Sequence, residues 1–345
     1  MKLALNTGYW AGVPPAGAPE AIAEAERLGF DSVWCSEAYG SDALTPLAWW
    51  GSATERVRLG TAIVQMSARQ PAATAMAAMT LDHLSGGRFI LGIGASGPQV
   101  VEGWYGMPFE KPLARTREYV GILRDIWARQ APVTNDGPHY PLPLRDGRGV
   151  AGLGKPLKSS IHPLREDIPI FLAAEGPKNV SLAAELCDGW MAMLLSPHER
   201  FYVDALAEGF ARPGARRSAE EFEVAAMVPF IVHDDVEAAV DMVRPFYALY
   251  FGGMGAKGGK NFHANVAIRM GYEAEITQIQ DLYLDGKKNE AAAVIPSELI
   301  QKMSLLGSSD KIRHDLAAWQ DSFVTTLLIA GDPPLLRQAA EIVLG

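Results

Sequence analysis

The stretch "RFILGIGASGPQ" (residues 88–99) decides between two folds, because its glycines at 92, 94 and 97 spell G-x-G-x-x-G after an apolar run. In a dinucleotide-binding unit such glycines open a helix, and an acidic residue ends the next strand about 20 residues further on. Here Gly103, Gly106 and Pro108 follow and interrupt any first helix. The stretch is therefore predicted to be one strand of a different α/β fold.

A short apolar strand followed by an amphipathic helix recurs along the whole chain. Eight segments predict strands: 3–8, 31–37, 57–65, 88–96, 168–176, 189–195, 222–233 and 325–331. Such apolar strands are typical of a parallel sheet buried on both faces, and eight strand–helix units predict a closed (β/α)8 TIM barrel. We expect a single domain over residues 1–345. It has two insertions, each expected to overhang one barrel face: about 132–167, after strand 4, and 252–322, between strands 7 and 8.

Composition excludes several classes of partner. Of the 345 residues, 48% are hydrophobic and 21% charged, which is enough apolar surface for a substantial core. The net charge is −9 without a basic run, so nucleic acid is not an expected partner. No segment approaches the ~18 apolar residues of a membrane-spanning helix, and the chain is expected to be cytoplasmic. Cys35 and Cys187 lie far apart in apolar segments and are predicted to be buried thiols.

Other local motifs are weak. The segment "GVAGLGKP" (149–156) matches G-x-x-x-x-G-K but carries Pro156 where a phosphate loop needs Ser or Thr, so it is predicted to be a solvated loop. Neither H-E-x-x-H nor a cysteine pair at ligand spacing occurs, and no metal site is predicted. G-x-S-x-G, the usual hydrolase elbow, is also absent.

In a barrel, functional groups collect where strands end. The predicted strand ends form a rim of small residues, which let a flat ligand approach the backbone, with aromatic side chains that could cover it. In "AAEGPKNV" (173–180), a helix begins after Gly176, so free N–H groups and Lys178 offer a phosphate site. A plain turn with a solvated Lys178 fits this segment equally well.

Four segments together resemble the luciferase-like monooxygenase superfamily, in its actinobacterial branch of coenzyme F420-dependent oxidoreductases. They are "SVWCSEAYGSDALTPLAW" (32–49), "VRLGTAIVQMSARQPAATAMAAMTLDHLSGGRFILGIGASGPQVVEGWYG" (57–106), "PLARTREYV" (112–120) and "FLAAEGPKNVSLAAELCDGW" (171–190). The resemblance covers essentially the whole chain in the right order. It implies a TIM barrel, usually dimeric, that holds the deazaflavin ring at its carboxyl rim.

The resemblance also implies a set of site residues. A non-prolyl cis peptide between Ala62 and Ile63 is expected to back the ring. Cofactor contacts are expected from Glu37, Ala62, Ile63, Gly94, Ala95, Ser96, Gly97, Ala174, Glu175, Gly176, Pro177, Lys178 and Asn179. The predicted walls are residues 95–97 on one side and 176–179 opposite. Glu37 and Tyr39 are the candidate catalytic residues, for proton management and for a hydrogen bond to substrate. The candidate substrate pocket consists of Tyr9, Trp10, Trp104, Met193 and His198.

The expected activity is hydride transfer between coenzyme F420 and a small organic substrate. Ala38 departs from the histidine of the branch's sugar-phosphate dehydrogenases, which puts sugar-phosphate oxidation in doubt. No arginine ends strand 4, as it often does in relatives that bind a flavin phosphate, and this favours the deazaflavin over FMN. Two alternatives stay open: an FMN-dependent monooxygenase and a non-catalytic flavin- or deazaflavin-binding protein.

Overall fold

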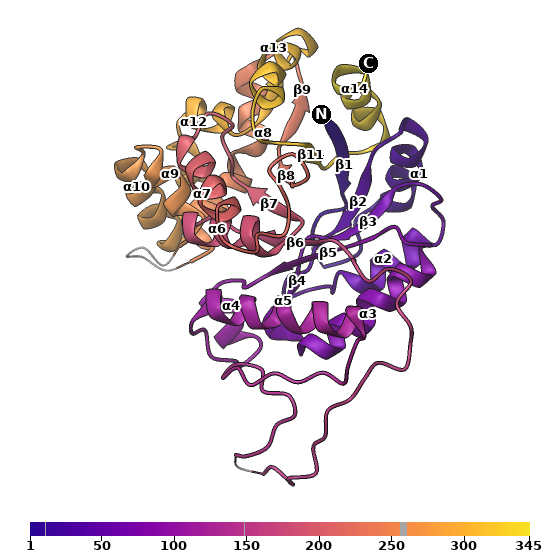
Figure 1. Ribbon diagram of the computed structural model, residues 1–345. Helices are drawn as coiled ribbons and strands as arrows, with labels where there is room; N and C mark the ends of the chain where they lie inside the picture. The colour runs from indigo at the N-terminus through magenta and orange to yellow at the C-terminus, as the bar shows by residue number, and fades with distance from the viewer. Residues whose placement is uncertain (11, 148, 256–260) are drawn as a thin grey trace.

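The computed structural model describes residues 1–345 except 11, 148 and 256–260. Within these residues, eight parallel strand positions close into a barrel, and the predicted TIM-barrel fold is confirmed. The strands are β1 (Lys2–Asn6), β2 (Ser32–Cys35), β3 (Arg58–Thr61) continued by β4 (Val64–Gln65), β5 (Phe89–Gly94), β6 (Ile170–Ala173), β7 (Gly189–Met193), β8 (Glu223–Met227) and β11 (Thr326–Ile329). Pairing of β3 with β5 closes the ring, which is visible at the centre of Figure 1.

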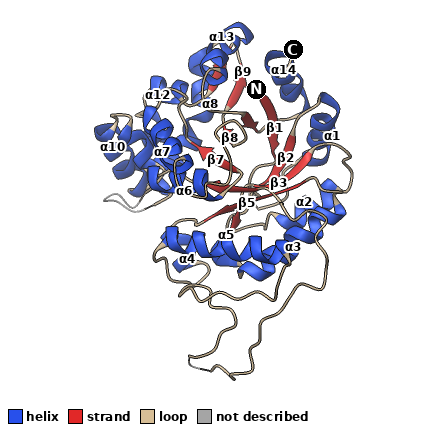
Figure 2. Ribbon diagram, viewed as in Figure 1, coloured by secondary structure: helices blue, strands red, loops and turns tan. Residues whose placement is uncertain are grey.

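Helices surround the barrel, as Figure 2 shows in blue. They are α1 (Ala18–Leu28), α2 (Leu44–Gly51), α3 (Pro71–Leu84), α4 (Pro98–Gly103), α5 (Pro112–Ala128), α6 (Pro177–Leu186), α7 (Arg200–Phe210), α8 (Val236–Ala248) and α14 (Pro333–Val343). Several of them, α6 included, begin with proline, whose fixed φ suits the first helical turn and whose missing N–H costs nothing there. None of the described helices is long and apolar enough to cross a membrane.

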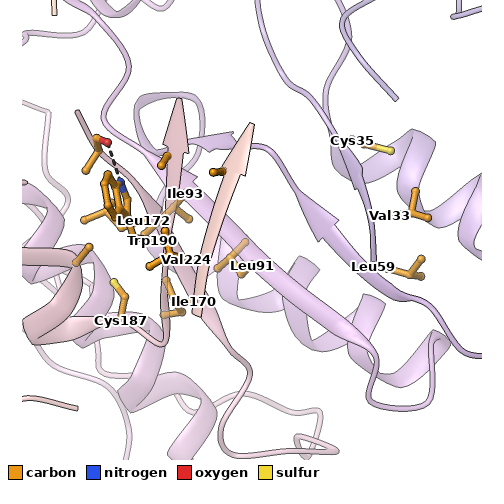
Figure 3. Packing of buried hydrophobic residues seen from close by; sticks show 14 of the residues in the cluster. Val33, Cys35, Leu59, Leu91, Ile93, Ile170, Leu172, Cys187, Trp190 and Val224 are labelled. Carbon is orange, nitrogen blue, oxygen red and sulfur yellow. Dashed lines mark hydrogen bonds between the residues drawn. The ribbon is translucent and has the colours of Figure 1, made fainter. Parts of the chain in front are cut away.

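Alternate residues of each strand face the barrel interior and the surrounding helices. On β5, Ile90 packs inside the barrel, whereas Leu91 and Ile93 belong to the core between barrel and helices (Figure 3). A Cβ on Gly92 would lie 1.8 Å from the carbonyl oxygen of Thr61, so only glycine fits at this inward position. Gly92 and Gly94 of the opening stretch therefore serve close packing between neighbouring strands.

Both cysteines are free and buried, as predicted. Burial raises the pKa of each thiol, Cys35 and Cys187, to about 12. Both lie in the packed region of Figure 3, where the Trp190 indole N–H donates to the Ala174 carbonyl over 2.8 Å. Thiolate chemistry is therefore not expected of either residue at neutral pH.

An ion-pair network joins the amino ends of the strands. Glu223 of β8 pairs with Arg58 of β3 and with Lys2 of β1, each at 2.8 Å. Burial would raise the pKa of Glu223, but the hydrogen bonds and charges of these two cations outweigh it and lower the pKa to about 2. This end of the barrel contributes stability rather than chemistry, as is usual for the fold.

The second insertion forms a helical unit with its own core beside the barrel. It comprises the π-helix η2 (Leu249–Gly253), α9 (Ala264–Arg269), α10 (Glu273–Leu284), α11 (Lys288–Ala293), α12 (Ser297–Lys302) and β10 (Leu305–Gly307). The helix that follows, α13 (Ser309–Gln320), packs instead on the main core of the barrel. The predicted seventh strand splits, because β9 (Phe230–Val232) leaves the barrel and pairs with β10. Residues 256–260 of the predicted insertion lie outside the described residues.

The described part of the first insertion packs against the helices around the barrel, and the overhang expected of it stays a prediction. Residues 132–167 follow α5 rather than a strand, and in Figure 1 much of this segment extends beyond α5, away from the barrel. Glu118 of α5 accepts hydrogen bonds from the backbone N–H groups of His139 and Tyr140. Near the end of this insertion, Arg165 pairs with the buried carboxylate of Asp82. This segment therefore packs on the helical shell.

Candidate functional site

The predicted site segments follow the barrel strands at the same end. Residues 7–10 follow β1, residues 36–39 follow β2, and residues 94–97 and 174–179 continue β5 and β6. Because the strands are parallel, their carboxyl ends meet on one rim, where this fold places its functional groups. Among the described residues, no group of three His, Cys, Asp or Glu is arranged to hold a metal ion.

The third strand is interrupted where the resemblance implies a bulge. The peptide bond between Ala62 and Ile63 is cis and separates β3 from β4. Ala62 packs inside the barrel, and the chain then rejoins the sheet, with Gln65 in register with Gly94 of β5. The bulge thus brings β4 beside the small residues at the end of β5.

Glu37 is buried directly behind this bulge. One carboxylate oxygen accepts from the backbone N–H of Gln65 at 2.9 Å, and the other accepts from that of Ala43 at 3.2 Å. The Arg69 guanidinium donates to both oxygens at 3.0 and 3.1 Å. Glu37 therefore ties together β4, the start of α2 and the turn before α3. These contacts favour a positioning role, and the proton transfer expected of Glu37 stays a prediction.

Gln65 is a polar side chain in a buried place, only 4% exposed. Its Oε1 atom has no hydrogen-bond donor among the described residues. A buried carbonyl oxygen without a donor carries a free-energy cost, so such an atom calls for an explanation. Sequence reasoning missed Gln65, although a polar residue inside the apolar run "TAIVQM" (61–66) was an available signal.

The end of β5 supplies a wall of small residues. Ala95, Ser96 and Gly97 are partly exposed, and Ser96 has a left-handed φ of 59°. A Cβ on Gly94 would lie 2.8 Å from the Ile63 side chain, so the backbone itself faces the bulge. Because β5 and β6 are paired neighbours, the predicted opposite walls, 95–97 and 176–179, are in fact adjacent.

The end of β6 leads into the N-terminus of α6. Gly176 precedes the helix in an extended conformation, and Lys178 is exposed. The Asn179 side chain donates through Nδ2 to the Ala173 carbonyl at 3.4 Å, but its buried Oδ1 has no donor among the described residues. This strand end therefore holds a second buried acceptor without a partner.

The second insertion adds residues to this rim that sequence reasoning did not identify. His263, directly before α9, pairs through Nδ1 with Glu175 at 2.5 Å, and the Arg269 guanidinium donates to the Glu175 carbonyl at 2.8 Å. The ring of Tyr250 meets that of His263 edge-on at 4.9 Å. Burial opposes protonation of His263, but the charge and hydrogen bond of Glu175 outweigh it and raise its pKa.

Tyr9 links β1 to this group through a hydrogen bond between its side chain and that of Tyr250. Burial raises the pKa of both phenols, and the carboxylate of Glu175 raises them further, so both stay protonated at neutral pH. Tyr39 is close enough to contribute to the same shifts. Tyr9 is nevertheless 45% exposed, so part of its side chain remains accessible at the rim.

The remaining predicted pocket residues are more dispersed. Trp10 packs against Trp50 of α2, with ring centroids 6.2 Å apart. Trp104, at the end of α4, is 64% exposed, and His198 is exposed in the turn before α7. Met193, at the end of β7, packs against the core of the second insertion. Their assignment to a substrate pocket stays a prediction.

Comparison with known proteins extends these observations. The sequence profile of the family described as luciferase-like monooxygenase matches residues 4–326. The chain is 56% identical over 345 residues (99% of each chain) to a Mycobacterium tuberculosis protein provisionally named a coenzyme F420-dependent oxidoreductase. It is 30% identical to the 5,10-methylenetetrahydromethanopterin reductase of Archaeoglobus fulgidus, over 90% of this chain and 87% of the reductase. The solved F420-dependent tetrahydromethanopterin reductase of Methanopyrus kandleri has the same fold, with a TM-score of 0.81 at 22% identity, covering 100% of this chain and 98% of the reductase.

Proposed function

The chain belongs to the luciferase-like monooxygenase family, and we propose that it transfers a hydride between coenzyme F420 and a small organic substrate bound over the cofactor ring. The deazaflavin, when bound, supplies or accepts the hydride at C5 of its ring. The relative that is 56% identical supports this choice of cofactor. The protein's part is to bind the cofactor, orient it and shelter the reacting centre.

The observation that carries the proposal is the end of β6, where a helix N-terminus and an unpartnered buried acceptor lie together. The α6 N-terminus and Lys178 suit a phosphate, since the N–H groups and the helix dipole favour an anion. The Asn179 Oδ1 atom has no donor, and a hydroxyl group of a bound cofactor would satisfy it. The small residues 94–97 on the adjacent strand allow a flat ring to approach the backbone. The residues present therefore fit a phosphate-bearing deazaflavin.

We assign handling of the substrate's polar group to the tyrosines of the rim. Tyr9 keeps its proton at neutral pH and remains accessible, so it can donate a hydrogen bond to a substrate oxygen or nitrogen. Tyr39, which is 57% exposed, can do the same from the neighbouring strand end. Glu37 holds the bulge in place from behind.

Titration of intrinsic tryptophan fluorescence with F420 and with FMN tests the choice of cofactor. We expect saturable quenching by F420 at micromolar concentration. Tight FMN binding without a response to F420 would instead support an FMN-dependent monooxygenase. Reduced F420 that binds but is not oxidised by any of a panel of ketones, enones and imines would support a non-catalytic binding protein.

A lysine variant tests the phosphate cradle separately. Replacement Lys178→Ala should weaken F420 about two- to fivefold, as expected for one charge near a helix N-terminus. It should leave the riboflavin-like fragment that lacks the phosphate unaffected. Lys288→Ala on α11 is the matched control. Equal weakening of F420 and the fragment would contradict the cradle.

We also propose that two copies of the chain associate through a groove between α2 and α3. None of its lining residues is charged: Leu44, Thr45, Ala48, Trp49, Ser52, Ala77, Thr80, Leu81 and Leu84. Trp49 is 79% and Leu84 75% exposed, an apolar patch suited to an interface. An uncharged face also lets two chains of net charge −9 meet. Trp49→Asp should convert a dimer to monomer in analytical ultracentrifugation, whereas Val203→Asp, an exposed apolar site on α7, should not.

A further inference from the structure

The backbone of Gln65 is held in a fixed place at the barrel rim. Its backbone N–H donates to Glu37, which is itself fixed by Arg69 and by the start of α2. On the other side, β4 pairs with β5 through Val64 and Gln65. The backbone of Gln65 is therefore anchored on both sides, which fixes the point on the rim from which its side chain starts.

The side chain of Gln65 faces the barrel interior. Val64 belongs to the core between barrel and helices, so its neighbour Gln65 lies on the opposite, inner face of the strand. Its register partner is Gly94, which has no side chain of its own. The contacts of a hypothetical Cβ on Gly94 would be the side chains of Ile63 and Ala173, which border the barrel interior. The Gln65 side chain thus leaves β4 beside bare backbone at the inner edge of the rim.

The unpartnered Oε1 atom of Gln65 requires a hydrogen-bond donor from a ligand. A buried carbonyl oxygen is stabilised by an N–H or O–H donor, and the adjoining NH2 group of the amide offers donors in the same plane. Flavins and deazaflavins share one edge with the complementary pattern, an imide N–H (N3) flanked by two carbonyl groups. Amide and imide can pair through two hydrogen bonds, N3–H to Oε1 and NH2 to a ring carbonyl.

We propose that Gln65 recognises the imide edge of the isoalloxazine-type ring and so fixes which end of the ring lies against the bulge at Ala62–Ile63. The assignment rests on the proposed function only in that a ring of this class binds at the rim. Since flavins and deazaflavins share the imide, Gln65 orients the ring and does not select between them. Its role is positioning, distinct from the hydride transfer itself.

A thermodynamic cycle between residue and ligand tests the proposal by binding alone. The ligands are 5-deazariboflavin and its N3-methyl derivative, which lacks the imide N–H, and both are titrated by tryptophan fluorescence. The proteins are the wild type, Gln65→Met, which keeps the approximate size but removes the amide, and Gln320→Met, an exposed control at the end of α13. Such a cycle isolates the interaction between the two altered groups.

We expect N3-methylation to weaken binding to the wild type and to Gln320→Met about tenfold, which corresponds to about 1.4 kcal/mol. For Gln65→Met the two ligands should bind equally, and both about tenfold more weakly than 5-deazariboflavin binds the wild type. The same methylation penalty in Gln65→Met as in the wild type would overturn the assignment, because the methyl group would then clash elsewhere.

The ligand half of the cycle needs no variant, so the proposal can fail even if Gln65→Met does not fold. Equal affinity of the wild type for both ligands would refute it outright. These failures differ from failure of the proposed function. If neither F420 nor any flavin binds, the function is wrong and the assignment falls with it. If flavins bind and deazaflavins do not, the cycle is run with riboflavin and N3-methylriboflavin, and coupling there would support the role of Gln65 while refuting the choice of cofactor.

Discussion

Replacement of Glu37 by alanine should destabilise the protein by about 3–5 kcal/mol without any direct loss of chemistry. The substitution leaves two buried backbone N–H groups, those of Ala43 and Gln65, without an acceptor. Each costs about 1–3 kcal/mol. The Arg69 side chain, 24% exposed, also loses its main carboxylate partner but can partly rehydrate. Glu37→Gln keeps one acceptor oxygen and replaces the other with an NH2 group, so only one of the two N–H groups loses its acceptor and the cost should be about 1–3 kcal/mol.

Urea unfolding followed by tryptophan fluorescence measures these differences as shifts of the midpoint. Glu55→Ala, an exposed glutamate a few residues before β3, is the matched control and should stay within about 0.5 kcal/mol of the wild type. A midpoint for Glu37→Ala equal to that of Glu55→Ala would refute the reasoning, since the two N–H groups would then be satisfied in another way.

Kinetics of Glu37→Gln distinguish positioning from proton transfer. If Glu37 only positions the bulge, the variant loses affinity for the cofactor while the pH profile of kcat keeps its shape. If Glu37 carries a proton in the reaction, one limb of that profile disappears while cofactor affinity is retained. The contacts of Glu37 predict the first result.

Three further predictions concern ionisation. The pKa of Glu223, lowered to about 2, contributes stability that is complete above its ordinary value of about 4.5 and is lost as the pH falls toward 2. In Glu223→Gln the urea midpoint should therefore fall less between pH 5 and pH 3 than it does in the wild type. An equal fall in both proteins would contradict this. Cys35 and Cys187, each with a pKa of about 12, should react with a thiol reagent at neutral pH only after unfolding; fast labelling of the native protein would exclude their burial. The raised pKa of His263 means that its pairing with Glu175 is complete below pH 6.5 and lost as the pH rises through the folded-state pKa. His263→Gln should remove this part of the pH dependence of stability, and an unchanged dependence would count against the ion pair.

The barrel could be predicted because periodicity is a local property of the sequence. Each strand is an apolar run of a few residues followed by helical spacing, and eight such units leave little choice of fold. The ends of individual strands were harder to predict from the sequence. The predicted strand 222–233 spans two strands, β8 and β9, that belong to different sheets. Composition did not distinguish β8 from β9, because both strands have apolar sequences and such sequences look alike in either sheet.

The location of the candidate segments could be predicted, since parallel strands bring all their carboxyl ends together whatever lies between them. Chain direction alone therefore places residues 94–97 and 174–179 at the same end of the barrel. What a side chain does there depends on its neighbours. Glu37 is a strand-end carboxylate in the sequence, and its occupation by two backbone N–H groups and an arginine is visible only in three dimensions.

The contribution of the second insertion could not be predicted for a physical reason. His263 and Glu175 are 88 positions apart, and their contact depends on how the helical unit docks on the barrel rather than on any local pattern. That docking places His263, which no sequence motif marks, against the carboxylate of Glu175 at the end of β6. The resulting pair raises the pKa of His263. Family members that share the barrel but differ in this insertion would keep the rim of strand ends and change the groups around Tyr9 and Tyr250. Variation in substrate within such a fold is therefore expected to follow the insertion, whereas cofactor binding follows the strand ends.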